Sequence, residues 1–162
     1  MKIRGFEIAK GFENMDVTLP CRSTKNSAGY DFSAIEDMEI PSYYSLLLEK
    51  ITKNEPIKPV LIKTGIKSYM GEDEVLYIYN RSSNPFKKGL VLANSVGIID
   101  SDYYGNPDND GHIMFAFYNV FDEDITIKKG EAIGQGVFSK YLVTDDDAAS
   151  GERQGGFGST DK

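Results

Sequence analysis

Two carboxylates and two tyrosines follow a short apolar segment in the middle of the chain. Ile98 and Ile99 precede Asp100, and Asp102, Tyr103 and a second tyrosine come directly after it. A carboxylate that emerges from an apolar strand is a candidate general base, because burial and neighbouring charges can tune its pKa. This segment is therefore the first candidate for a catalytic site.

Two further polar turns contain groups that could bind phosphate or a cation. Residues 80–83 place Arg81 and two serine hydroxyls before a short helix that we expect over 84–88, and such groups suit phosphate oxygens. Within residues 28–34, Asp31 lies just inside a predicted strand, where it could take a hard cation directly or through water. A solvated turn has a similar composition, so neither segment is specific by itself.

The C-terminal segment is polar and rich in glycine. Its one large apolar residue, Phe157, is flanked by glycines, with Arg153 before it and Ser159 after it. Disorder is the general expectation for such a terminus. Here the glycines would let the backbone approach a ligand while the ring stacks on a flat group. We expect residues 1–142 to form the catalytic domain and 143–162 a flexible arm that closes over the active site.

Length and charge restrict the class of protein. The 162 residues suffice for one domain, and 25 acidic against 18 basic residues give a net charge of −7. This charge argues against a broad basic face for nucleic acid. The single cysteine, Cys21, and the absence of an apolar N-terminal run predict a cytoplasmic protein that does not enter a membrane.

The apolar segments have the length of strands. They cover residues 75–79, 89–93, 113–120 and 133–142, and turns rich in Asn, Gly and Asp separate them. This pattern predicts an all-β fold: a β-sandwich, jelly roll or small barrel. One helix is predicted over 42–53 from apolar residues at helical spacing, although a partly ordered surface insertion would also account for that stretch.

Taken in order, these segments resemble the five motifs of the trimeric all-β deoxyuridine triphosphatases (dUTPases), over nearly the whole chain. The third motif and its lead-in are the most specific. Five motifs in the right order are far more specific than any one alone. The matching segments are 28–34, 81–83, 89–94 with 96–105, 130–135 and 155–160.

This resemblance implies Mg²⁺-dependent hydrolysis of dUTP to dUMP and pyrophosphate, which supplies dUMP and limits uracil incorporation into DNA. Asp31 would hold the magnesium-triphosphate through coordinated waters, and Asp100 would activate the water that attacks the α-phosphate. Tyr103 would pack under the deoxyribose, and Phe157 would stack over uracil. The implied substrate-binding residues are Arg81, Ser82, Ser83, Asn94, Gly97, Ile99, Tyr103, Gln135, Arg153, Phe157, Gly158 and Ser159.

The resemblance also implies a homotrimer whose active sites lie between subunits. Two positions depart from the family pattern: Asn80 stands where a proline is common, and Arg153 lies one place later than the usual arginine. Residues 43–59 and 106–110 are longer than in a minimal member. Such additions are compatible with dUTPases of bacteriophages, which would act in the host cytoplasm. They could contact a protein partner, or they are tolerated surface insertions.

Two other functions fit the same scaffold. A dCTP deaminase shares the trimeric all-β fold but needs a further base-side acid, and we find no glutamate motif for it. A nucleotide-sensing module would keep the pocket without turnover, and the intact set of polar site residues argues against that. Neither Cys21 nor His112 is assigned a role, and His112, at a predicted strand start, is expected to face solvent.

Overall fold

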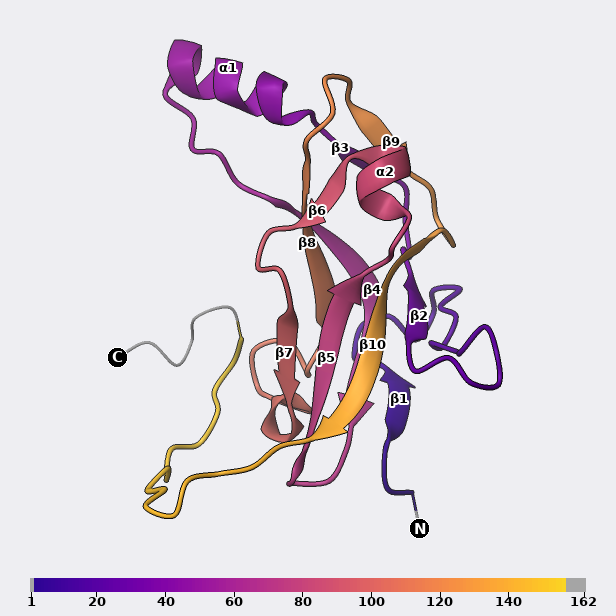
Figure 1. Ribbon diagram of the computed structural model, residues 1–162, viewed down its shortest axis with the longest axis vertical. Helices are drawn as coiled ribbons and strands as arrows, with labels where there is room; N and C mark the ends of the chain where they lie inside the picture. Colours follow the sequence, from indigo (N-terminus) through magenta and orange to yellow (C-terminus); the bar gives the residue numbers. More distant parts are fainter. Residues whose placement is uncertain (1, 157–162) are drawn as a thin grey trace.

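The computed structural model describes residues 2–156 (Figure 1). Within that range the chain is built mainly from strands, as the all-β prediction requires. In chain order the elements are β1 (Gly5–Ile8), β2 (Tyr30–Ser33), β3 (Met38–Ile40), α1 (Tyr43–Lys53), β4 (Val60–Tyr69), β5 (Glu74–Asn80), α2 (Asn84–Lys88), β6 (Leu90–Leu92), β7 (Gly97–Asp100), the 3-10 helix η1 (Ser101–Tyr103), β8 (Ile113–Asn119), β9 (Ile125–Ile127) and β10 (Ala132–Lys140).

Two four-stranded antiparallel sheets enclose the core. Their strand orders are β1-β4-β8-β6 and β2-β10-β5-β7, and β3 pairs with β9 in a separate ribbon. The sheets meet through aromatic rings: Phe32 of β2 lies 5.5 Å from Phe115 of β8, centroid to centroid, and both are fully buried. Burial of such a side chain stabilises the fold by about 2–3 kcal/mol. The β-sandwich prediction is confirmed.

Alternate residues of β8 are buried, as expected for a strand that faces the core with one side. On the opposite sheet, Gly134 of β10 lies directly against the Phe115 ring, and a Cβ at that position would overlap the ring. The second sheet therefore approaches the first closely where β10 crosses the core. This sheet carries Asp31 on β2 and Asp100 on β7, the carboxylates of the two candidate pockets described below.

Both predicted helices are present. Ser42 caps α1 by accepting a hydrogen bond from Ser45 N at 3.1 Å, and the helix ends at Asn54, which has a φ of 59°. No residue of α1 is buried, and Figure 1 shows the helix standing out at one end of the molecule. Helix α2 begins with the Asn84-Pro85 pair and ends at Gly89, which has a φ of 63°. Neither helix in the described range is long and apolar enough to cross a membrane.

After β10 the chain continues to residue 156 without another helix or strand. Figure 1 shows this segment leaving the end of β10 and then turning back beside β7. Arg153 joins it to the body of the molecule through hydrogen bonds to Asp100 and Asp102. The arm thus reaches the end of β7, where Asp100, the predicted base, lies.

Candidate active site

A cavity of about 200 Å³ lies at the end of β7, and we call it the Asp100 pocket. It brings together six of the predicted site residues: Asn94, Gly97, Ile99, Asp100, Tyr103 and Arg153. These come from β7, the turn before it, η1 and the arm, so a local run and a distant segment share one cavity. The full lining is Ile78, Asn94, Gly97, Ile98, Ile99, Asp100, Tyr103, His112, Ile113, Met114, Arg153 and Gly156.

Strand β7 is the edge strand of its sheet, with β5 as its one neighbour there. The backbone N–H and C=O groups on its outer side are therefore available for a ligand. At Gly97 a side chain would not fit, because a Cβ would overlap Ile78. The cavity thus combines apolar walls with a row of backbone donors and acceptors, which is the composition expected of a specific small-molecule site.

Tyr103 forms a fixed wall of the Asp100 pocket. The residue is 7% exposed, and its hydroxyl donates to the backbone oxygen of His112 at 3.0 Å. The same hydroxyl accepts a hydrogen bond from Asn109 Nδ2 at 2.7 Å. Burial raises the pKa of Tyr103 above its ordinary value, with the Asn109 hydrogen bond acting in the opposite direction. The phenol is therefore neutral and held by both of its hydrogen bonds.

Arg153 lies between the two carboxylates of the η1 region. Its Nε donates to Asp102 Oδ1 at 2.6 Å, its NH2 group donates to Asp100 Oδ2, and its guanidinium carbon is 5.9 Å from the centre of the Tyr103 ring. Burial opposes its charge, but the hydrogen bond and charge of Asp102, together with the charge of Asp100, leave the pKa of Arg153 above its ordinary value. In this structure the guanidinium is thus a cation bound to the candidate base.

A second cavity, of about 210 Å³, lies around Asp31, and we call it the Asp31 pocket. Gln135 of β10 pairs with Asp31 of β2, which places both residues at the same level of the sheet. Arg81 Nε lies 3.6 Å from Asp31 Oδ1, and Ser23 Oγ donates to Asp31 Oδ2 at 2.6 Å. The lining consists of Ser23, Ser27, Gly29, Asp31, Arg81, Ser82, Ser83 and Gln135. All five residues predicted for magnesium and phosphate outside the arm are in this one pocket.

The two pockets lie at opposite edges of one sheet. Asp31 is on the edge strand β2 and Asp100 on the edge strand β7, with β10 and β5 between them. Along β5, the level of Asp31 corresponds to Tyr79 and that of Asp100 to Val75. Three strand spacings and four residues along a strand correspond to about 14 Å and about 13 Å, or about 20 Å in total. The two pockets of one chain are therefore well separated.

The prediction for His112 was wrong. Its ring is 6% exposed, Nε2 accepts a hydrogen bond from Gly65 N at 3.0 Å, and Phe12 packs on it at 4.4 Å between ring centres. Burial, with a smaller effect from the charge of Lys63, lowers the pKa of His112 to about 4. His112 lines the Asp100 pocket and supports Tyr103 through its backbone oxygen.

Sequence reasoning also missed Ser23, Ser27 and Asn109. Ser23 reaches Asp31 because the backbone of Cys21 bridges to Asp31, a long-range contact that leaves no local signal. Asn109 lies within residues 106–110, for which the sequence predicts a turn of added length but no part in the site. The predicted ligands Phe157, Gly158 and Ser159 lie outside the described residues.

Comparison with known proteins agrees with the motifs. The dUTPase family model matches residues 15–161. The chain is 50% identical over 162 residues to the deoxyuridine 5′-triphosphate nucleotidohydrolase of Lactococcus lactis subsp. lactis (strain IL1403), covering 99% of each chain. It is 32% identical over 168 residues to the protein of the same description from Actinobacillus pleuropneumoniae serotype 5b (strain L20), covering 100% of this chain and 99% of the relative.

Solved structures show the same fold. The crystal structure of a dUTPase from Streptococcus mutans superposes with a TM-score of 0.72 at 43% identity, covering 87% of this chain and 98% of that one. A mutant dUTPase from phage phi11 of S. aureus, described with the coordination of a structural Mg(II) ion, has a TM-score of 0.64 at 17% identity, covering 93% and 98%. The second likeness concerns the fold alone.

Proposed function

Because the chain belongs to the dUTPase family and hydrolyses dUTP to dUMP and pyrophosphate, we propose that the Asp100 pocket binds the deoxyuridine and that Asp100 is the general base. One observation carries the proposal. Asp100, the buried Tyr103 and the open edge of β7 line a single cavity. A base, a rigid wall and fixed backbone groups are what selective hydrolysis of a nucleotide needs.

Asp100 would accept a proton from the attacking water. The water oxygen forms a bond to the α-phosphorus, the bond from that phosphorus to the bridging oxygen breaks, and pyrophosphate leaves. In the structure Arg153 binds Asp100. Incoming phosphate oxygens would compete for the guanidinium, since arginine binds phosphate in the same forked manner as carboxylate. Once the Arg153 guanidinium binds the phosphate in place of Asp100, the carboxylate would be free to bind the water. The guanidinium would then stabilise the charge that develops on the phosphate.

Selectivity for deoxyuridine would come from shape and from polar groups that cannot move. The Tyr103 ring would pack under the sugar, where a 2′-hydroxyl would meet a buried apolar face without a hydrogen-bond partner. Asn94 and the edge of β7 around Gly97 and Ile99 would bind the polar edge of uracil. Cytosine presents an acceptor where uracil presents a donor, so the same groups would leave it with an unsatisfied contact. Phe157 would stack over the base from the arm.

The Asp31 pocket would bind the phosphates and Mg²⁺. Arg81, Ser82 and Gln135 offer a cation and hydrogen-bond donors to phosphate oxygens. The pocket has one carboxylate, and residues 2–156 contain no group of three His, Cys, Asp or Glu side chains around a common point. This donor set fits Mg²⁺, which binds mostly to water and substrate phosphates and uses few protein carboxylates. The ion would neutralise and orient the phosphates, with Asp31 holding its waters.

In a homotrimer with shared active sites, the Asp100 pocket of one subunit would lie next to the Asp31 pocket of another. Each pocket would then be one half-site of a complete active site. Within one chain, Asp100 and the Asp31 pocket are about 20 Å apart by strand spacing, whereas the phosphorus atoms of a triphosphate lie within a few ångströms of one another. A base must be within hydrogen-bond reach of its water. One dUTP would therefore contact the Asp100 pocket of one subunit and the Asp31 pocket of another.

The proposed location is the cytoplasm, or the host cytoplasm if a phage encodes the protein. The chain has one cysteine, Cys21, and it is exposed as a free thiol. A reducing compartment suits this thiol content.

The test is pyrophosphate release from dUTP, dCTP, dTTP and UTP, each with Mg²⁺ and with a chelator. We expect release from dUTP alone, and only with Mg²⁺. Ammonia release from dCTP would instead indicate a deaminase. Binding of dUTP without any turnover would indicate a nucleotide-sensing module.

A further inference from the structure

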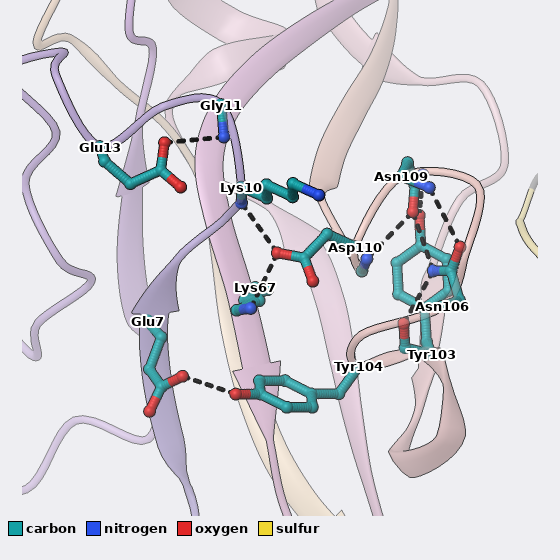
Figure 2. A network of polar contacts seen from close by, with 11 residues as sticks. Glu7, Lys10, Gly11, Glu13, Lys67, Tyr103, Tyr104, Asn106, Asn109 and Asp110 are labelled. Carbon is teal, nitrogen blue, oxygen red and sulfur yellow. Dashed lines mark hydrogen bonds and ion pairs between the residues drawn. The ribbon is translucent and has the colours of Figure 1, made fainter.

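The hydroxyl of Tyr103 is held by residues beyond the proposed contact with the sugar. It donates to the backbone of His112 and accepts from Asn109, at 3.0 and 2.7 Å. Asn109 belongs to the loop 106–110, one of the two stretches that are longer than in a minimal family member. An added loop therefore touches the residue proposed to exclude ribose (Figure 2).

The side-chain amide of Asn109 can take one orientation in this network. Its Oδ1 accepts from Asn106 Nδ2 at 2.9 Å and from Gly111 N at 3.1 Å. If the amide were flipped, its NH2 group would face Asn106 Nδ2 and Gly111 N, which are themselves hydrogen-bond donors. Nδ2 therefore points to Tyr103, and Asn106, which is 6% exposed, also donates to the backbone oxygen of Tyr103 at 2.8 Å.

The loop is anchored to the sheet at its other end. Asp110 Oδ2 accepts from Lys67 Nζ and from Lys10 N, both at 2.8 Å, as Figure 2 shows. Burial alone would raise the pKa of Asp110, but these hydrogen bonds and the lysine charges hold it below its ordinary value. The carboxylate stays charged and the loop stays attached to β4. Asn109 thus rests on a fixed support and is not the tip of a free loop.

We propose that Asn109 is a positioning residue for sugar selectivity, which it exerts by holding the Tyr103 ring in place; this rests on the proposed packing of Tyr103 against the deoxyribose. An apolar wall alone rejects an added hydroxyl only weakly. Rejection is stronger when the wall cannot retreat, because the hydroxyl then stays both unpaired and crowded. With Asn109 removed, Tyr103 keeps one hydrogen bond, and its ring can shift to admit a ribose.

The test compares kcat and KM for dUTP and UTP in Asn109→Ala, Tyr103→Phe and the double variant. We expect Asn109→Ala to lower the ratio of kcat/KM for dUTP to that for UTP by about 5- to 20-fold, mainly through faster UTP hydrolysis. In the Tyr103→Phe background, where the hydroxyl is absent, the same substitution should change the ratio less than about twofold. The matched control is Asp108→Asn, an exposed neighbour in the same loop, which should leave the ratio unchanged.

A general loosening of the loop would lower the ratio equally in both backgrounds, and that result would overturn the inference. The inference would also be overturned if Asn109→Ala left the ratio unchanged while Tyr103→Phe lowered it. In that case the proposed role of Tyr103 would still stand. If Tyr103→Ala leaves the ratio unchanged, the proposed sugar contact and the inference both fail. Should Asn109→Ala not fold, Asn109→Ser keeps a hydroxyl that can accept from Gly111 N, but its shorter side chain does not reach the Tyr103 hydroxyl. It should also lower the ratio, and an unchanged ratio would count against the proposal.

Discussion

The Asp100 pocket and the Asp31 pocket have nearly the same volume but are built differently. In the first, Tyr103 is 7% exposed and both hydrogen bonds of its hydroxyl are satisfied by protein groups. In the second, the side chains of Asp31 and Arg81 are 26% and 38% exposed and their closest charged atoms are 3.6 Å apart. The Tyr103 wall of the first pocket is fixed before any ligand arrives, although the side chain of Asp100 is itself 45% exposed. The second pocket leaves both of its charged groups accessible to a ligand.

This difference matches what each pocket would have to recognise. Discrimination between nucleosides that differ by one hydroxyl or one ring atom requires walls and donors that do not move. A triphosphate with its metal supplies strong charges of its own, so accessible side chains can arrange around it. The Asp100 pocket, which we call the rigid pocket, would provide selectivity. The Asp31 pocket, which we call the open pocket, would provide charge.

The largest effect should come from the base in the rigid pocket. Asp100→Asn keeps the shape of the side chain and removes its ability to accept a proton. We expect kcat to fall by about 10³-fold or more, while the affinity for a non-hydrolysable dUTP analogue changes little. Turnover within tenfold of wild type would contradict the assignment. Rapid-quench assays of turnover and calorimetric titration of the analogue provide the two measurements.

The separation of the pockets can be tested by mixing two inactive variants. Asp100→Asn disables one half-site and Arg81→Ala the other. If each active site combines the Asp100 pocket of one subunit with the Asp31 pocket of another, random reassembly of equal amounts should restore about one quarter of wild-type sites. Activity is measured after mild dissociation and reassociation.

The control for this mixture is each variant reassembled with itself, which should remain inactive. No recovery in a mixture shown by mass spectrometry to contain hybrid trimers would mean that each site is formed by one chain. That result would contradict the proposed sharing of sites.

The free energy of unfolding should depend on pH through His112, which lines the rigid pocket. The pKa of the buried ring is about 4, against an ordinary value of 6.5. The unfolded state therefore binds a proton first, so this stabilisation is complete above pH 6.5 and is lost as pH falls toward 4. Between pH 7 and pH 5 the free energy of unfolding should drop by about 2 kcal/mol more in wild type than in His112→Gln. Urea unfolding at both pH values measures the difference, and parallel changes in the two proteins would contradict it.

Local sequence patterns predicted both helices and the strands β2, β5, β7 and β10 of the sheet that carries Asp31 and Asp100. Apolar residues at helical spacing predicted α1, and the apolar segment before Asp100 predicted a carboxylate at a strand end. The distance between the pockets was beyond such reasoning, because it follows from the strand order β2-β10-β5-β7. Local patterns do not specify which strands become neighbours.

Contacts across long sequence separations account for the other failures. Gly111-His112 has the composition of an exposed strand start, and His112 is buried because Gly65 and Phe12 pack on it from elsewhere in the chain. Asn109 has the composition of an ordinary turn residue. Its proposed role rests on the hydrogen bond of its amide to the Tyr103 hydroxyl, which no local pattern specifies.

The smallest effect should come from Ser23 in the open pocket. Its hydroxyl donates to Asp31 Oδ2 at 2.6 Å in an exposed setting, and so orients the carboxylate proposed to hold the waters of Mg²⁺. A solvent-exposed hydrogen bond of this kind contributes about 0.5–1 kcal/mol, so Ser23→Ala should raise the Mg²⁺ concentration for half-maximal activity by about two- to fivefold. Magnesium titration of turnover measures this, with Ser139→Ala on β10 as the matched control. A loss as large as that from Asp31→Asn would show that the open pocket is as tightly organised as the rigid one, and the contrast between the two pockets would fail.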